Sequence, residues 1–242
     1  MSSAPRSRLN GNLPPPVPLD AAARVWSVNN AVVVVVPLGK VTPQSEWISS
    51  AEYVRAARIH HRRSRHQFLA SRTLLRQWIS QVTGQAANHL TLDTGPHGKP
   101  FLVEDPTLQF NLSHGGDWLM IVLSDRQAVG VDLEPIQPRR RLDQLCRRYL
   151  SEAESQSVLA LPLDEATLQF LRYWTCKEAY VKGLGVGLTI PLNTVELTLP
   201  PNPQSTEPQC LESTQGLELG WRIYQWQPTP GYVAALALKG QA

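Results

Sequence analysis

The run AVVVVVPL, residues 31–38, constrains the fold most, because its five consecutive valines have the β-branched density that is typical of a buried strand. A long helical region is predicted after it, from about Ser49 to Val82. The segments LTLDTGPHGKPFL and TLQFNLSHGGDWLMIVLS are then predicted to form strand pairs, with Gly115-Gly116 as the turn of the second pair. Helices that alternate with short antiparallel strands predict the α+β class.

The second half of the chain repeats this mixture. A strand, AVGVDLEPI, precedes a helical block from about Arg141 to Leu161, and the helix that contains KEAYVK should end at the glycines of GLGVG. The segments NTVELTL, LELGWRIYQW and GYVAALALK return to strand. We therefore divide the chain into a flexible Pro-rich tail (1–22), an N-terminal α+β half (23–126) and a C-terminal α+β half (127–242).

The composition indicates a globular protein and argues against several classes. The 242 residues carry a formal net charge of +3, which is too weakly basic to indicate a nucleic-acid partner. The cysteines, Cys146, Cys176 and Cys210, stand far apart and match no disulfide or zinc pattern. No apolar run resembles a signal peptide or is long enough to span a bilayer. We expect a cytoplasmic protein without a membrane partner.

Two carboxylates lie on one face of the strand AVGVDLEPI. The period of two places its apolar residues on one side and Gly130, Asp132 and Glu134 on the other. Anions about 7 Å apart repel each other unless they face water or share a cation. A solvated strand face is one interpretation. The other is a Mg²⁺ site, because Mg²⁺ needs only a few carboxylates and Gly130 leaves space on the acidic face.

The helix RYWTCKEAYVKG, residues 172–183, places an acid among bases. Trp174, Glu178 and Lys182 follow one another at i, i+4 and i+8 on one face, and Lys177 is displaced from them by about 100° per residue. A surface salt bridge between Glu178 and Lys182, worth roughly 0.2–0.5 kcal/mol, would by itself explain why the two residues are four positions apart.

The order GVDLE, roughly forty residues, then WTCKEAYVK resembles the signature of the 4'-phosphopantetheinyl transferases, which load the arm of coenzyme A onto carrier proteins. The two motifs at this spacing are specific, although neither is specific alone. The chain length and the pieces GKPFL and FNLSH resemble the larger, surfactin-synthetase-activating class. The resemblance runs from about Arg55 to the C-terminal strands.

This resemblance implies a fold and a reaction. The fold would be two similar α+β halves related by a pseudo-twofold, each a small antiparallel sheet with packed helices, with coenzyme A in the cleft between them. The reaction would be the Mg²⁺-dependent transfer of the 4'-phosphopantetheine arm to a serine of an acidic apo acyl or peptidyl carrier protein, releasing adenosine 3',5'-bisphosphate. A chain that carries both halves would act as a monomer.

The resemblance also implies a role for particular residues. Asp132, Glu134 and Glu178 would bind Mg²⁺, and Glu178, Lys182 and His114 would be catalytic. Coenzyme A would be bound through its phosphates, pyrophosphate and adenine by Arg55, Arg58, Arg72, Gly98, Lys99, Pro100, Ser113, His114, Lys177 and Lys182. Within that set, Arg72 would grip the 3'-phosphate and the Gly98–Pro100 turn would line the adenine. Glu154 matches a family glutamate near the site.

Two other functions remain as alternatives. A metal-dependent nuclease or phosphohydrolase would also combine acids with a lysine around Mg²⁺, but such nucleases usually place the lysine two residues after the second acid, where this chain has Ile136. A nucleic-acid-binding module could use the arginines between Arg55 and Arg76. That module would leave the paired carboxylates unexplained.

The segment PRRRLDQLCRRYL forms the densest positive patch near the proposed metal strand. Its arginines are Arg139, Arg140, Arg141, Arg147 and Arg148. A solvated helix face would explain them. A docking surface for an acidic carrier protein would explain them equally well.

Overall fold

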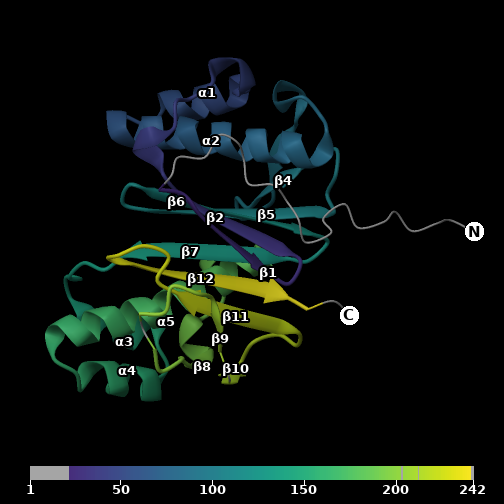
Figure 1. Ribbon diagram of the computed structural model, residues 1–242. Helices are drawn as coiled ribbons and strands as arrows, with labels where there is room; N and C mark the ends of the chain where they lie inside the picture. The colour runs from purple at the N-terminus through teal and green to yellow at the C-terminus, as the bar shows by residue number, and fades with distance from the viewer. Residues whose placement is uncertain (1–21, 203, 212, 241–242) are drawn as a thin grey trace, which may run out of the picture.

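The computed structural model describes residues 22–202, 204–211 and 213–240, and the predicted tail lies outside these ranges up to residue 21. Two antiparallel sheets are stacked in the middle of the molecule, with α1 and α2 above the upper sheet and α3, α4 and α5 below the lower one (Figure 1). The layers therefore run helix, sheet, sheet, helix. The α+β class with antiparallel sheets is confirmed.

The upper two layers come from the N-terminal part of the chain. Their elements are β1 (Arg24–Val28), β2 (Ala31–Pro37), α1 (Ser50–Ala57), α2 (Arg62–Thr83), β3 (Leu92–Thr94), β4 (Pro100–Leu102), β5 (Leu108–Gly115) and β6 (Trp118–Asp125). The sheet has the order β1-β2-β6-β5, and β3 and β4 form a separate hairpin. The β5–β6 turn is Gly116-Asp117 rather than Gly115-Gly116, because Gly115 is the last residue of β5.

The lower two layers come from the C-terminal part. Their elements are β7 (Val129–Pro135), α3 (Leu142–Tyr149), α4 (Glu152–Leu159), α5 (Leu163–Leu184), β8 (Glu196–Thr198), β9 (Gln209–Cys210), β10 (Ser213–Gln215), β11 (Trp221–Trp226) and β12 (Tyr232–Lys239). The sheet order is β7-β12-β11-β9, and β8 pairs with β10. Helix α5 ends at Gly185, which has a left-handed φ of 72°.

Strand β2 explains why a run of valines is needed. Val32, Val34 and Val36 pack into the core beneath α2, whereas Val33 and Val35 pack into the core between the two sheets. Both faces of β2 are therefore buried. If apolar residues alternated with polar ones, the polar side chains would be buried in one of the two cores. The predicted buried strand is confirmed.

The predicted helix from Ser49 to Val82 is wrong as one element, because it divides into α1 and α2. The carboxylate of Glu52 in α1 accepts a hydrogen bond from Arg76 Nε in α2 at 3.0 Å. Residues this far apart in one continuous helix would be separated by about 36 Å. The chain therefore reverses between the helices, and the block predicted from Arg141 to Leu161 is likewise two helices, α3 and α4.

Strand β7 lies directly against α5 at a glycine. A Cβ atom added to Gly130 would come within 2.1 Å of the Ala179 carbonyl oxygen and 2.2 Å of the Gly183 nitrogen. The prediction that Gly130 leaves space for a ligand is therefore wrong, since the space is filled by the backbone of α5. The predicted faces of the strand are correct, because Val129, Val131 and Leu133 all point into the core between the sheets.

The edge of β7 is closed by side chains of β5. Asn111 Oδ1 accepts a hydrogen bond from the Val131 nitrogen at 3.0 Å, and Ser113 Oγ accepts one from the Leu133 nitrogen at 3.3 Å. These side chains take the place of a neighbouring strand. The residues of β5 and β7 consequently meet at the junction between the two sheets.

Two predictions about organisation remain predictions. The pseudo-twofold relation between the halves is consistent with one helix-covered sheet in each part of the chain, and the boundary at residues 126 and 127 falls between β6 and β7.

Among the described residues, no helix has the length and apolar character needed to cross a membrane.

Candidate functional site

The centre of the site joins three elements. Ser113 of β5 donates a hydrogen bond to Asp132 Oδ1 of β7 at 2.8 Å, and Lys182 of α5 donates to the same oxygen at 2.6 Å and to Ser113 Oγ at 3.0 Å. Asp132 is only 4% exposed. The predicted residues Ser113, Asp132 and Lys182, which are far apart in sequence, therefore form one connected polar cluster.

Two carboxylate oxygens beside this cluster have no hydrogen-bond partner within the described part of the chain. They are Asp132 Oδ2 and Glu178 Oε1, and both are buried. Burial raises the pKa of Glu178, Lys182 lowers it, and the charges of Asp132 and Glu134 raise it further. Glu178 thus lies within electrostatic reach of both predicted partners. Buried carboxylate oxygens that accept no hydrogen bond are suited to coordinate a divalent cation.

Glu134 is oriented differently from the other two acids. Its Oε2 accepts a hydrogen bond from Arg139 at 2.5 Å, and its Oε1 accepts one from Trp174 Nε1 at 3.2 Å. Burial and Asp132 raise the pKa of Glu134, whereas Arg139 and Trp174 lower it. Among the residues that the structure describes, no three His, Cys, Asp or Glu side chains converge on one metal position. The unpartnered oxygens of Asp132 and Glu178 would be the ligands of a metal ion, and Glu134 would have to leave Arg139 to join them.

His114 follows Ser113 on β5 and faces the positive side chains. The pKa of His114 is lowered to about 4, first because the groups packed around the ring disfavour its charged form and then because Lys182 and Arg72 add positive charge. Its imidazole is consequently neutral near pH 7. His114 also shows that Lys182 and Arg72 belong to one electrostatic environment.

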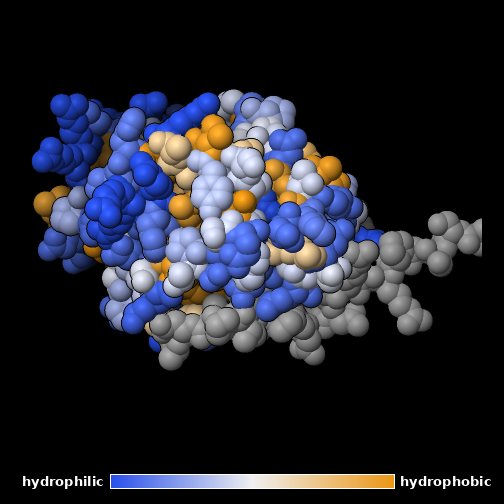
Figure 2. Space-filling model, turned by 90° about the horizontal axis from the view of Figure 1, so that it is seen from above, coloured by the Kyte–Doolittle hydropathy of each residue, from blue (hydrophilic) through white to orange (hydrophobic). Residues whose placement is uncertain are grey.

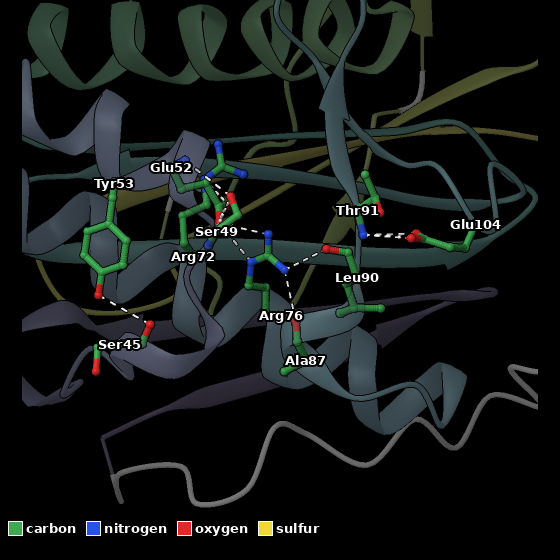
Figure 3. A network of polar contacts seen from close by, with 10 residues as sticks. All are labelled: Ser45, Ser49, Glu52, Tyr53, Arg72, Arg76, Ala87, Leu90, Thr91 and Glu104. Carbon is green, nitrogen blue, oxygen red and sulfur yellow. Dashed lines mark hydrogen bonds and ion pairs between the residues drawn. The ribbon is translucent and has the colours of Figure 1, made fainter.

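A pocket between α1, α2 and the β3–β4 hairpin gathers two of the predicted arginines. It is lined by Ser49, Ala51, Glu52, Arg55, Phe68, Arg72, Leu92, Asp93, Thr94 and Pro100. Arg72 lies close to Glu52, which in turn pairs with Arg76 (Figure 3). The predicted residues Arg55, Arg72 and Pro100 are therefore brought together. Arg58 is an exposed residue at the end of α1 and is not part of this lining.

The Gly98–Pro100 turn has a structural contact that the sequence does not reveal. Lys99 Nζ donates hydrogen bonds to the carbonyl oxygens of Gly183, at 2.7 Å, and Val129, at 3.0 Å. Burial lowers the pKa of Lys99 to about 8. The side chain fastens the β3–β4 hairpin to α5 and β7, while Gly98 supplies the turn with a φ of 82°. The contact of this turn with adenine remains a prediction.

Lys177 requires a correction. Its side chain is 0% exposed, and Nζ donates to Glu154 Oε2 at 2.5 Å and to the carbonyl oxygens of Tyr149, Leu192 and Val195. Burial lowers its pKa, and Glu154 opposes this effect. With four protein oxygens around it, this ammonium does not contact coenzyme A phosphates. The structure also explains Glu154, whose role the sequence leaves open.

Comparison with known proteins identifies the class. Residues 128–237 match the 4'-phosphopantetheinyl transferase superfamily, and residues 41–126 match the N-terminal family of 4'-phosphopantetheinyl transferases. The chain is 32% identical to 4'-phosphopantetheinyl transferase HetI of Nostoc sp. over 207 residues, which are 84% of each chain. The protein therefore belongs to the 4'-phosphopantetheinyl transferase superfamily.

Its relatives also place it among the larger members. It is 30% identical to 4'-phosphopantetheinyl transferase Sfp of Bacillus subtilis over 153 residues, which cover 63% of this chain and 67% of that one. The predicted surfactin-synthetase-activating type is confirmed. Thermotoga maritima holo-[acyl-carrier-protein] synthase is 16% identical, covers 48% of this chain and 64% of its own, and has a TM-score of 0.32.

Sequence reasoning missed three participants in the site. Phe68 lines the arginine pocket. Asn111 holds the edge of β7, and Arg139 binds Glu134. The alternation of NLSH could have suggested Asn111, because it places that side chain two residues before Ser113 on one face of the strand.

We expect Lys177→Met to destabilise the protein by about 3–5 kcal/mol, because it leaves the buried Glu154 carboxylate without its counter-charge. Urea unfolding followed by circular dichroism measures the change. Lys40→Met is the control for loss of a lysine, since Lys40 is exposed. Equal losses of stability for the two variants would contradict the assignment of Lys177 to a structural role.

We expect Asp132→Asn to lose Mg²⁺ binding, because it replaces one of the two carboxylates that carry an unpartnered oxygen. Calorimetric titration of the free protein with MgCl₂ tests this without any transfer assay. Glu165→Gln, an exposed acid on α5, should bind as the unaltered protein does. Mg²⁺ binding by Asp132→Asn at wild-type affinity would show that Asp132 is not a ligand.

Proposed function

We propose that this protein transfers the 4'-phosphopantetheine arm of coenzyme A to a serine of an apo carrier protein, with Mg²⁺ as the cofactor. The observation that carries this proposal is the meeting of Ser113, Asp132 and Lys182 beside unpartnered carboxylate oxygens, together with a pocket that contains Arg55 and Arg72. Membership of the superfamily supports the reaction.

Asp132 and Glu178 would hold the metal through their unpartnered oxygens. Glu134 would be the third ligand once its carboxylate had released Arg139 and turned to the metal. Mg²⁺ supplies positive charge to the oxygens of a transferred phosphoryl group and orients them. The remaining stabilisation comes from the protein. Lys182 is placed beside Asp132 and Ser113, where its ammonium would face the pyrophosphate as a mobile point charge.

The positions of these residues support the following transfer reaction. The carrier serine oxygen forms a bond to the β-phosphorus of coenzyme A, and the bond from that phosphorus to the bridging oxygen breaks. The bridging oxygen leaves with adenosine 3',5'-bisphosphate, whose charge Lys182 stabilises. The serine proton would pass to the carboxylate of Glu178, through the oxygen that does not hold the metal. His114 would donate its ring N–H to a pyrophosphate oxygen, because it is neutral near pH 7.

The nucleic-acid alternative loses two of the arginines that suggested it. Arg76 is 1% exposed and donates to Glu52, Ala87 and Leu90, and Arg72 points into the pocket. Hydrophilic side chains gather at the end of the upper face where α2 begins, on the left of Figure 2. The exposed arginines there form a short cluster and do not extend along the helix.

We also propose that the enzyme is a cytoplasmic monomer. One chain contains Ser113, Asp132, Glu178 and Lys182, so the site needs no second copy. All three cysteines are free thiols, which suits a reducing compartment.

We expect the purified protein, incubated with coenzyme A, Mg²⁺ and an apo carrier protein, to raise the carrier mass by one phosphopantetheine arm. Intact-protein mass spectrometry detects the product, and peptide sequencing locates it on serine. A reaction with EDTA and a reaction with the Lys182→Met variant are the controls. If several apo acyl and peptidyl carriers all keep their original mass, the proposed function is wrong.

The positive patch after β7 suits an acidic carrier. Arg140, Arg141, Arg147 and Arg148 are exposed at and within α3. The guanidinium of Arg148 lies 5.1 Å from the centre of the Tyr149 ring, and Tyr149 packs against Trp174 beside Glu134. The patch therefore borders the carboxylate cluster. The fifth arginine of the predicted patch, Arg139, is engaged by Glu134.

We expect the double variant Arg140→Glu/Arg141→Glu to raise the KM for the carrier about tenfold, equivalent to ~1.4 kcal/mol, and to leave the KM for coenzyme A nearly unchanged. Complementary charges chiefly accelerate association, and salt screens them. Steady-state kinetics with each substrate varied in turn, at low and high salt, measure both constants.

Arg222→Glu, an exposed position on β11, controls for added negative charge in general. Its KM for the carrier should stay close to that of the unaltered enzyme. An unchanged carrier KM for the double variant at low salt would place the docking surface elsewhere.

A further inference from the structure

Phe68 of α2 has an unusual pair of neighbours. The guanidinium carbon of Arg55 lies 5.3 Å from the centre of its ring, and that of Arg72 lies 5.2 Å from it. Both distances fall within the range of a cation–π contact. Arg55 comes from α1 and Arg72 from α2, so one aromatic ring supports cations from two helices.

The positive charge of this group is compensated only in part, because Arg55, Arg72 and Arg76 are accompanied by two acids, Glu52 and Asp93. Glu52 lies between Arg76, to which its Oε2 is paired at 2.9 Å, and Arg72, whose Nε is 3.7 Å from its Oε1 (Figure 3). The longer distance is beyond hydrogen-bond range. Burial, Arg55 and Arg76 all lower the pKa of Arg72, and only Glu52 opposes them.

The arginines also line an opening that a ligand can enter. The pocket has a volume of about 170 Å³, and Thr94 and Pro100 of the β3–β4 hairpin form its opposite side. The Arg72 side chain is 12% exposed, whereas Arg55 is exposed. A half-buried and an exposed guanidinium, both facing one pocket, form a site for a strongly charged anion.

We infer that Phe68 is a positioning residue, which holds Arg55 and Arg72 as a paired clamp for a phosphate monoester. This inference rests on the proposed function, under which the monoester is the 3'-phosphate of coenzyme A. Phe68 itself does not touch the phosphate. It acts through the two arginines, and it makes the enzyme select coenzyme A over nucleotides that lack the 3'-phosphate.

The physical reason is conformational. A long arginine side chain loses roughly 1.5–2 kcal/mol of rotamer entropy when it is fixed, and two like charges held together repel each other. An aromatic face orients both guanidiniums before the ligand arrives and contributes about 0.5–1 kcal/mol per exposed contact. An aliphatic residue of similar bulk would fill the space without orienting the cations.

The test compares two nucleotides by calorimetry: adenosine 3',5'-bisphosphate, which has the 3'-phosphate, and adenosine 5'-monophosphate, which lacks it. We expect Phe68→Leu to weaken binding of the bisphosphate about tenfold and to leave binding of the monophosphate unchanged. Phe68→Tyr, which keeps the aromatic face, should restore the preference. In an Arg55→Gln background, the loss caused by Phe68→Leu should shrink, because one of the two supported cations is already absent.

Phe110→Leu is the matched control, since Phe110 is 1% exposed in the core beneath α2. It should lower the melting temperature and leave the ratio of the two affinities intact. An equal loss for both nucleotides in Phe68→Leu, or no loss for either, overturns the clamp. Unaltered protein that binds neither nucleotide overturns the coenzyme A pocket itself, whereas equal binding of both keeps the pocket and overturns the selective clamp.

Discussion

The contact between α5 and β7 is the constraint on which the candidate site depends. Gly130 allows the helix backbone to approach the strand more closely than any side chain would permit. At this separation, Lys182 reaches Asp132 directly, and Glu178 lies within reach of two carboxylates. On another side of the same helix, Lys177 is fixed to Glu154 and three carbonyl oxygens. The buried Lys177–Glu154 ion pair on one face of α5 therefore helps to fix the position of Glu178 and Lys182 on another face.

Under the proposed function, the site combines two kinds of cation for two tasks. The ammonium of Lys182 lies at the carboxylate cluster, where a compact charge can follow a moving phosphoryl group. The guanidiniums of Arg55 and Arg72 lie at the pocket, where planar donors suit a stationary phosphate. The positive charges of Lys182 and Arg72 act on His114, whose pKa they lower together with desolvation, which is the larger cause. The positive potential of these charges would attract a polyanionic substrate before any specific contact forms.

The sequence predicted the elements better than their contacts. The period of two in AVGVDLEPI correctly placed Asp132 and Glu134 on one face, and the helical ridge correctly placed Lys182 toward them. Helical periodicity separated Lys177 from the face of Lys182, but it did not show that Lys177 is buried, because the roles of the two lysines depend on Glu154 and Asp132, which lie far away in the chain. The reversal between α1 and α2 escaped prediction for the same reason. The Glu52–Arg76 ion pair, which joins α1 to α2, forms only after the chain has folded back.

The junction of β5 and β7 has a consequence for how the enzyme can change during evolution. The two sheets are joined there by the side chains of Asn111 and Ser113, not by a ladder of backbone hydrogen bonds. A backbone ladder accepts almost any sequence, but this joint requires particular residues, and Ser113 belongs to both the joint and the site. Substitutions that retune the chemistry at Ser113 also loosen the seam. Variation in substrate range is thus easier to acquire at the rim of the site than at its centre.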